Sequence, residues 1–356
     1  MDIFSFIIHP LTLEDFYRKF TWVRKFPKSL VKKVNRYIPP FKLSKITGIK
    51  SKTGKEIEGY FFTCPLTSEQ IINSDQKFAL QKIIDTVQKA KKKGSNIVGL
   101  GSFTSVVGDK GITISKNVDI PVTTGNSYTV ATALEGSKLA VQKMGMDLKN
   151  EVITVIGANG SIGKTVSRLI AKESFRLNLV SRNINKLKQL SELIKNENKN
   201  IEIMYTDQIQ KALQESKIII SASGAVKSLI DPANLLSGAV VCDVARPRDV
   251  ARNIENQRKD ILVIEGGLVR IPGSVNFNFD FGIGNQNAYA CMAETMLLTL
   301  EEKYVNYSLG PNIQIEKVKE TMEMAEKHGF QLAGLRSSGE LLTDEKIKQI
   351  RKKANN

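Results

Sequence analysis

The most constraining feature of this 356-residue chain is a glycine-rich turn between a strand and a helix. Residues 152–156 form an apolar, β-branched run, Gly157, Gly160 and Gly163 follow it, and residues 164–171 have a helical pattern. The first glycine permits a tight turn, the second lets the backbone approach a pyrophosphate, and the third lets the helix pack closely on the strand. Glycines also occur in ordinary turns, but the strand before and the helix after favour a dinucleotide-binding turn with its phosphates at the helix N-terminus.

The residues after the next predicted strand indicate which dinucleotide is bound. Residues 177–180 are followed by Ser181 and Arg182, where an NAD-binding enzyme places an acidic residue for the ribose 2′-hydroxyl. An arginine accommodates a 2′-phosphate instead. The sequence therefore predicts NADPH, with a solvated surface arginine as the alternative interpretation.

Strands and helices alternate regularly beyond residue 149. Strands are expected near residues 152–156, 177–180, 201–204, 217–221, 239–242 and 261–264. Such alternation is typical of a doubly wound parallel sheet, whose ligands lie beyond the carboxyl ends of the strands. The predicted cofactor-binding residues are therefore those of the glycine turn and of the loops that follow the later strands: Gly157, Asn159, Gly160, Ser161, Ile162, Gly163, Ser181, Arg182, Ala222, Ser223, Gly224, Asp243, Gly266 and Gly267.

The remaining segments predict an N-terminal α/β domain that C-terminal helices complete. Residues 42–50 and 56–63 read as a hairpin, and residues 68–93 as one long helix with Ser68 as its N-cap. Later helices are expected at 130–143, 286–304 and 313–327. The fold class is thus α/β, with a substrate domain at 1–149, a Rossmann domain at 150–270, and a helical segment at 271–356 that packs back on the first domain.

Composition limits the partners and the compartment. The net charge of +16 implies an acidic partner, but no nucleic-acid motif and no basic stripe with interleaved aromatics is present. Three scattered cysteines provide neither a disulfide framework nor a metal site, which favours a reducing cytoplasm. No run approaches membrane-spanning length, so a soluble protein is expected, with peripheral lipid contact left open.

Cys291 is the candidate nucleophile. It lies near the start of a predicted helix, after a glycine-rich loop, and a helix N-terminus lowers the pKa of a thiol. Its apolar neighbours Ala290 and Met292 favour the competing interpretation, a buried core cysteine. The two histidines look like turn and helix-end residues, so a histidine general acid is not expected.

Several motifs that are not general to dinucleotide-binding folds resemble the long-chain fatty acyl-ACP reductases, over about residues 6–335. They are residues 99–105 (GLGSFTS), 123–126 (TTGN), 155–163, 182–183, 230–233, 266–267, 290–294 (ACMAE) with 296–298, 315–317 and 328–331 (HGFQ). The resemblance implies NADPH-dependent reduction of a fatty acyl thioester, on acyl carrier protein or coenzyme A, to the aldehyde. It also implies that Cys291 takes the acyl group and that Lys77 and Lys82 occupy matching catalytic positions.

The developing oxyanion needs hydrogen-bond donors. The polar residues of two of these motifs are the predicted substrate-binding set: Ser102, Ser105, Thr124 and Asn126. Two other functions stay in play. Residues 221–224 and 243–248 also resemble loops of glutamyl-tRNA reductase and the shikimate dehydrogenase group, although the cysteine motif that the tRNA enzyme needs is not visible around Cys64. The other alternative function is that of a regulatory protein that senses NADPH without catalysis.

Overall fold

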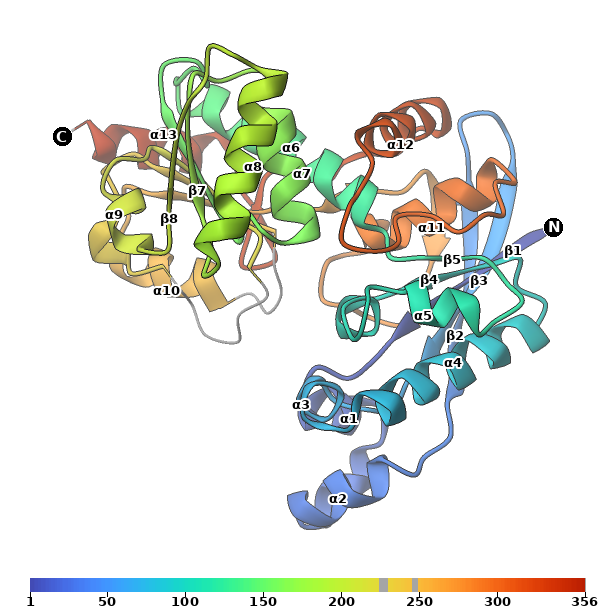
Figure 1. Cartoon of the computed structure of the whole chain (residues 1–356). Coiled ribbons are helices and arrows are strands. Elements are labelled where there is room, and N and C mark those ends of the chain that lie inside the picture. Colours follow the sequence, from blue (N-terminus) through green and yellow to red (C-terminus); the bar gives the residue numbers. More distant parts are fainter. Residues whose placement is uncertain (224–229, 245–248, 356) are drawn as a thin grey trace. The chain divides into compact units, whose positions relative to one another are not determined.

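The structure is a computed structural model, and it describes residues 1–223, 230–244 and 249–355, without the side chains of residues 18, 19 and 249–252. The chain divides into two compact units (Figure 1). Unit 1 comprises residues 1–125, 271–311 and 323–330, and unit 2 comprises residues 126–270, 312–322 and 331–356. Unit 2 thus includes the helix that begins at Asn126, which the sequence analysis assigned to the first domain.

Unit 1 is built on a mixed six-stranded sheet of order β13-β2-β3-β1-β4-β5. β2 and β3 form the predicted antiparallel hairpin, and β3, β1, β4 and β5 run parallel to one another. Phe62, Val98 and Leu100 pack on one face against Ile83 and Val87 of the long helix α4. The strands are β1 (Asp2–Ile8), β2 (Phe41–Lys50), β3 (Glu56–Thr63), β4 (Ile97–Leu100), β5 (Val122–Thr123), β13 (Gly273–Asn276) and, outside this six-stranded sheet, β14 (Asn287–Tyr289).

The helices of unit 1 cover both faces of this sheet. Gly99 of β4 faces Thr295 of α11, whereas its neighbours Val98 and Leu100 face α4, so α4 and α11 lie on opposite faces. The helical elements are α1 (Leu13–Lys19), η1 (Thr21–Lys25), α2 (Lys28–Asn35), α3 (Ser68–Asn73), α4 (Gln76–Lys92), η2 (Ser102–Ser105), α5 (Ile112–Lys116), α11 (Ala290–Leu300) and the C-terminal part of α12 (Ile315–His328).

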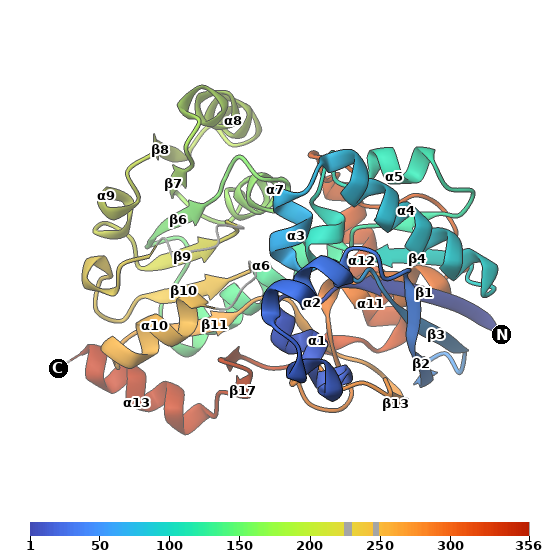
Figure 2. The same ribbon diagram turned by 90° about the horizontal axis from the view of Figure 1, so that it is seen from below.

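Unit 2 contains a parallel six-stranded sheet of order β11-β10-β9-β6-β7-β8 (Figure 2). Its strands are β6 (Val152–Ile156), β7 (Arg176–Val180), β8 (Glu202–Thr206), β9 (Ile218–Ser221), β10 (Val240–Asp243) and β11 (Leu262–Glu265). Numbered within the unit, this is the order 3-2-1-4-5-6 of the doubly wound dinucleotide-binding fold, with the order reversing between β6 and β9. The prediction of a Rossmann domain, with six strands at these places, is confirmed.

Helices and four short strands complete the described part of unit 2. Its helical elements are α6 (Asn126–Lys143), α7 (Ser161–Ile170), α8 (Ile184–Glu197), α9 (Ile209–Leu213), η3 (Pro232–Asn234), α10 (Asp249–Gln257) and α13 (Asp344–Ala354), and its further strands are β12 (Leu268–Arg270), β15 (Gln331–Leu332), β16 (Arg336–Ser337) and β17 (Glu340–Leu341). Within the described residues, no helix combines the length and the apolar character needed to cross a bilayer.

Two helix predictions were wrong in detail. The helix expected at 68–93 is broken after Asn73, because Asp75 caps a second helix with a hydrogen bond from the Lys77 N–H. The first N-cap is Thr67 rather than Ser68, and its side chain accepts from the Gln70 N–H. The helix expected from residue 286 begins at Ala290, after strand β14, which puts Cys291 in its first turn.

Candidate functional site

The glycine turn has the geometry that a pyrophosphate requires. Gly157 adopts φ +80°, and a Cβ there would lie 2.9 Å from the Ala222 carbonyl oxygen. A Cβ on Gly163 would lie 2.3 Å from the Gly157 carbonyl oxygen, so only glycine fits at the close approach of helix to turn. Gly160 is the N-cap of α7, and no side chain caps that helix. Backbone N–H groups at its start therefore suit a phosphate, and these residues fit a dinucleotide.

Arg182 is exposed two residues after β7 ends. The loop that carries it is held in place, because Asn159 Nδ2 donates to the Asn183 carbonyl oxygen at 2.9 Å and the Asn183 side chain caps α8. The Ser181 N–H donates to the Thr206 carbonyl oxygen at 3.2 Å. The arginine thus lies beside the glycine turn, where the ribose 2′ substituent is expected.

The other predicted cofactor residues lie at the carboxyl ends of the neighbouring strands. Half-buried Ala222 and Ser223 follow β9, across the point where the strand order reverses, and Ala222 N–H donates to the Ile156 carbonyl oxygen at 2.9 Å. Asp243 is buried at the end of β10. A Cβ added at Gly266 would lie 3.2 Å from Cys242 Sγ. Ser161 and Ile162 open α7, Gly267 adopts φ +87°, and Gly224 lies outside the described residues.

Cys291 lies in the first turn of α11. Within α11 every residue except Cys291 is buried, and Cys291 is half-buried. No side chain caps the N-terminus of this helix, whose N-cap is Tyr289. An apolar helix that is buried all round but reaches the surface at a single thiol is poorly explained as core packing alone. The arrangement suits a nucleophile stabilised by the helix N-terminus.

Two predicted motifs pack against the first turns of the helix that carries this thiol. Gly125, at φ +72°, lies so close that a Cβ there would be 2.2 Å from the Cys291 Cα. Thr123 Oγ1 donates to Glu294 Oε1 at 2.5 Å, and both residues are buried. A Cβ on Gly99 would lie 2.2 Å from Thr295 Oγ1. The structure therefore brings residues 99–105, 123–125 and 290–294 together in unit 1, and Asn126 directly follows Gly125 in the chain.

The four predicted substrate-binding residues differ in what they can still donate. Ser105 Oγ donates to the Ser102 carbonyl oxygen at 2.7 Å, and Thr124 Oγ1 donates to the Ser308 carbonyl oxygen, with both residues buried. Their hydroxyl protons are therefore engaged within the fold. Ser102, at φ +51°, and Asn126, the first residue of α6, are half-buried. These two stay the better candidates for a donor to a substrate carbonyl.

The remaining predicted residues lie away from the thiol. Lys77 and Lys82 both belong to α4, which covers the face of the sheet opposite α11. Lys77 is exposed at the start of the helix, and Lys82 Nζ donates to the Ile38 carbonyl oxygen at 3.1 Å. Their catalytic role stays a prediction. Cys64 and Cys242 are fully buried, and burial raises the pKa of their thiols to about 11 and about 12.

His9 is a positioning residue that sequence reasoning missed, since only the fold shows what its ring contacts. It follows β1, and its Nε2 accepts from the Phe103 N–H at 3.2 Å, within the loop of the 99–105 motif. Its Nδ1 lies 3.0 Å from the Pro10 carbonyl oxygen, which accepts the remaining ring proton. Burial lowers the pKa of His9 to about 4, so the ring is neutral when it holds this loop.

We expect the stability of the protein to fall on acidification through His9. The pKa of His9 is about 4 in the folded state and 6.5 in the unfolded state. Neutral His9 therefore makes its full contribution to the free energy of unfolding above pH 6.5, and this contribution is lost as the pH falls toward 4. The loss reaches about 2 kcal/mol at pH 5. Urea midpoints of His9→Gln between pH 7.5 and pH 5 should therefore vary less than those of the wild type.

The other histidine provides the comparison for this measurement. His328 is also buried, between Ser51 Oγ at 2.7 Å and Glu301 Oε1 at 2.6 Å, and burial lowers its pKa as well. It is therefore a bridging residue rather than the simple helix-end residue predicted. Urea midpoints of His328→Gln over the same pH range separate the part of the pH dependence due to His328 from the part due to His9. If the midpoints of His9→Gln change with pH as those of the wild type do, the pKa of His9 is not lowered.

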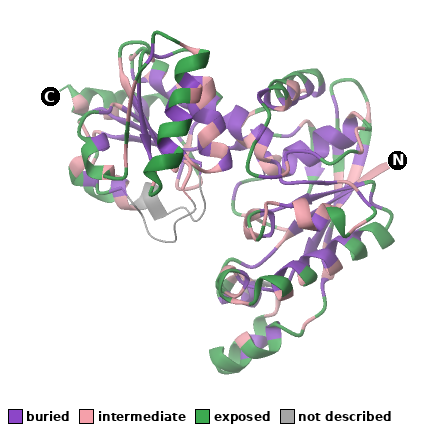
Figure 3. Cartoon of the chain, in the orientation of Figure 1, coloured by how far each residue is buried: buried purple, intermediate pink, exposed green. Residues whose placement is uncertain are grey.

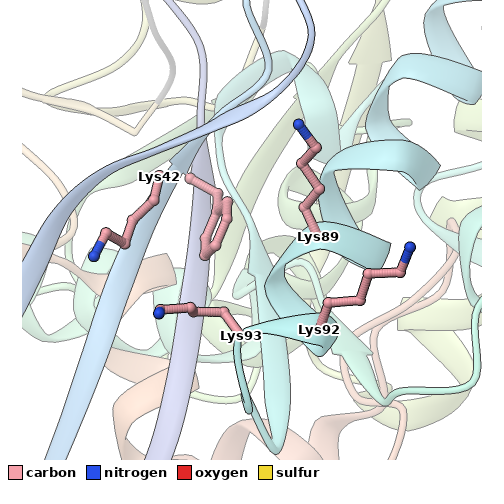
Figure 4. A pocket seen from close by; sticks show the side chains of 5 residues that line it. Lys42, Lys89, Lys92 and Lys93 are labelled. Carbon is pink, nitrogen blue, oxygen red and sulfur yellow. The ribbon is translucent and has the colours of Figure 1, made fainter.

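A cluster of lysines surrounds a groove of about 340 Å³ in unit 1 (Figure 4). Lys89 Nζ donates to the Pro40 carbonyl oxygen at 2.6 Å, and Lys42 Nζ lies 5.2 Å from the centre of the Tyr60 ring. Lys92 and Lys93 are exposed and form no ion pair with any residue in the described part of the chain. The lysine groove, lined by Lys42, Phe62, Lys89, Lys92 and Lys93, suits an anionic partner.

Comparison with known proteins agrees with this geometry in unit 2. The model of the shikimate / quinate 5-dehydrogenase family matches residues 138–265, which run from α6 to the end of β11. Unit 2 is a Rossmann fold of the kind that binds nicotinamide dinucleotides, and the predicted class of cofactor is confirmed.

Three relatives extend over more of the chain. Aminotransferase PigE of Serratia sp. is 31% identical over 320 residues, which cover 88% of this chain and 37% of that protein, so this chain spans little more than a third of its length. Long-chain acyl-[acyl-carrier-protein] reductase of Synechococcus elongatus is 28% identical over 82% of this chain and 87% of that protein. Glutamyl-tRNA reductase of Cyanophora paradoxa is 24% identical over 74% of this chain and 60% of that protein.

Proposed function

We propose that this chain is an NADPH-dependent reductase that converts a fatty acyl thioester, on acyl carrier protein or coenzyme A, into the aldehyde through an acyl group bound to Cys291. The observation that carries the proposal is the half-buried thiol at the start of an otherwise buried helix, against Gly125. The likeness to the Synechococcus reductase over most of both chains supports the same reaction.

The first half-reaction is proposed to need Cys291 and Ser102 of unit 1 and Asn126, which directly follows Gly125 in the chain. The Cys291 thiolate attacks the thioester carbonyl, the bond between that carbon and the carrier sulfur breaks, and the carrier leaves as a thiol after taking up a proton. Ser102 and Asn126 are proposed to hold the carbonyl oxygen as its charge develops. When bound, NADPH supplies the hydride for the acyl carbon. Breaking the bond to Cys291 Sγ then releases the aldehyde and restores the thiolate.

The residues of unit 2 select the dinucleotide. The backbone at the start of α7 is proposed to bind the pyrophosphate, and Arg182 the 2′-phosphate. The Asn159 hydrogen bond to the Asn183 carbonyl oxygen holds the arginine loop against the glycine turn. Such preorganisation lowers the entropic cost of binding.

A second candidate, a glutamyl-tRNA reductase, is favoured by the likeness to the Cyanophora enzyme. That reading needs a nucleophilic cysteine in the N-terminal region, where Cys64 is fully buried with a raised pKa. A thiol of this kind is inert at neutral pH. The structure therefore favours the acyl-thioester reductase, and a non-catalytic NADPH sensor is the third possibility.

One assay separates the three functions. The protein is incubated with NADPH and palmitoyl-CoA, and loss of nicotinamide absorbance is followed together with formation of the aldehyde. The proposal expects stoichiometric loss of both substrates. Turnover only with glutamyl-tRNA would favour the second candidate, and tight NADPH binding without turnover of either substrate would favour the sensor.

We further propose that the lysine groove docks an acidic acyl carrier protein. The KM for palmitoyl-acyl carrier protein should therefore rise with ionic strength, because screening weakens contacts between exposed charges. Lys92→Glu/Lys93→Glu should raise this KM about tenfold, since each charge reversal removes an attraction and adds a repulsion.

Two controls apply to this prediction. The KM for the uncharged palmitoyl thioester of N-acetylcysteamine should not change in the variant. Lys195→Glu/Lys199→Glu reverses two exposed charges in unit 2 and should leave both KM values near those of the wild type. A KM for the carrier substrate that is independent of salt would contradict docking by charge.

A further inference from the structure

An apolar stripe on the N-terminal part of unit 1 is left outside its core. From residue 22 to residue 37, large apolar side chains recur about every fourth residue and are between 46% and 79% exposed: Trp22 in η1, Leu30 and Val34 in α2, and Phe26 and Tyr37 beyond the ends of these helices. Leu30 and Val34 lie one turn apart on α2 and therefore share a face. Monomeric soluble proteins rarely expose contiguous apolar patches of this kind unless they bind something.

The stripe belongs to an anchored element. The inner side of the same segment is buried, with Val23 and Val31 packed against Phe16 and Tyr17 of α1. Gln70 of α3 also donates to the Lys32 carbonyl oxygen at 2.7 Å. Figures 1 and 3 show α2 at the periphery of unit 1, mostly exposed. The outward direction of the stripe is therefore fixed by packing on its other side.

The same segment is strongly basic. The chain has no Asp or Glu from Phe16 to Lys55, and residues 21–38 alone carry Arg24, Lys25, Lys28, Lys32, Lys33 and Arg36. Arg24 and Lys32 pair with acidic residues, and Arg36 lies over the Phe78 ring. Lys25, Lys28 and Lys33 have no ion pair with any residue whose position the structure describes. These three charges are available to an anionic surface.

We propose that this η1–α2 surface binds the face of an anionic lipid bilayer. A short amphipathic helix with large apolar residues on one face and lysines beside them lies in the plane of a membrane interface, with its apolar side chains at the boundary of headgroups and acyl chains. Trp22 and Tyr37 are side chains that favour this boundary. The surface of an acidic protein would match the lysine charges, but it would also need an apolar groove of its own to cover the apolar stripe.

The chain contains its own probe of this contact, because Trp22 is its single tryptophan. The full chain is titrated with vesicles of phosphatidylcholine alone and with vesicles that also contain phosphatidylglycerol, and tryptophan emission is recorded. We expect a blue shift with the anionic vesicles and quenching when the lipids carry bromine on their acyl chains. Neither should occur with phosphatidylcholine alone at physiological salt.

Matched variants test the two parts of the surface while keeping Trp22. Lys25→Gln/Lys28→Gln/Lys33→Gln should weaken vesicle binding about 100-fold, because each lysine near an anionic surface contributes on the order of 1 kcal/mol. Leu30→Gln/Val34→Gln should weaken it about tenfold through lost apolar burial. The controls Lys188→Gln/Lys195→Gln/Lys199→Gln and Phe175→Gln change exposed residues of unit 2 and should bind as the wild type does.

Three results would overturn the proposal. The first is unchanged emission with both kinds of vesicle. The second is a blue shift that grows with protein concentration in the absence of lipid, which would assign the stripe to a second copy of the chain. The third is a shift with acyl carrier protein but not with vesicles. Far-ultraviolet circular dichroism of each variant, matching the wild type, ensures that lost binding is not lost folding.

Discussion

Replacing Cys291 by alanine should lower kcat for thioester reduction by at least about 10⁴-fold, because removing a covalent nucleophile eliminates the acyl-enzyme route. The fold should be little affected, since Cys291 is the half-buried residue of α11 while its neighbours in that helix carry the packing. Steady-state NADPH oxidation with palmitoyl-CoA measures the first expectation and thermal unfolding the second.

The acyl adduct gives an independent readout of the same residue. Without NADPH, intact-protein mass spectrometry of the wild type with palmitoyl-CoA should show one added palmitoyl group, and Cys291→Ala should show none. Cys64→Ala and Cys242→Ala are matched controls that remove the same sulfur from fully buried sites, and both should keep the adduct. Turnover by Cys291→Ala at the wild-type rate would refute the assignment of the nucleophile.

The sequence predicted the parallel sheet of unit 2 well because its signals are local. Strands buried on both faces are apolar over most of their length, as Ile218, Ile219 and Ile220 of β9 show. The turn after β6 needs glycine where a Cβ would meet backbone. Each feature can be recognised from a few consecutive residues. Boundaries set by capping were less predictable, as the break at Asp75 shows.

The surroundings of Cys291 were predictable only in part, because they depend on contacts between distant segments. Gly125 meets Cys291, and His9 holds the backbone at Phe103, across sequence separations that no local pattern encodes. The sequence predicted the hydroxyls of Ser105 and Thr124 as oxyanion donors, but in the fold both donate to backbone carbonyl oxygens. Residue type indicated which side chains could act there, and packing decided which were already engaged.

Replacing Arg182 by aspartate should reverse the choice between NADPH and NADH. Loss of a charge-assisted hydrogen bond to the 2′-phosphate costs about 1.5–3 kcal/mol, and an aspartate adds repulsion while offering an acceptor to the 2′-hydroxyl of NADH. The ratio of kcat/KM for NADPH to that for NADH should therefore fall by about 10²–10³-fold. Most of the change should appear in KM, because the 2′-phosphate is bound equally in the ground and transition states.

The local fold should survive this substitution, which is what makes the test discriminating. Arg182 is exposed, and the hydrogen bond between Asn159 Nδ2 and the Asn183 carbonyl oxygen does not involve its side chain. Lys195→Asp makes the same change of charge at an exposed position in the last turn of α8 and should leave the ratio unchanged. Equal losses with both dinucleotides in Arg182→Asp would mean that the arginine supports the turn instead of reading the 2′ position. Calorimetric titration with 2′,5′-ADP and with 5′-AMP, which lacks the 2′-phosphate, separates the two roles: recognition by Arg182 requires the variant to lose affinity for 2′,5′-ADP alone, whereas support of the turn would lower the affinity for both.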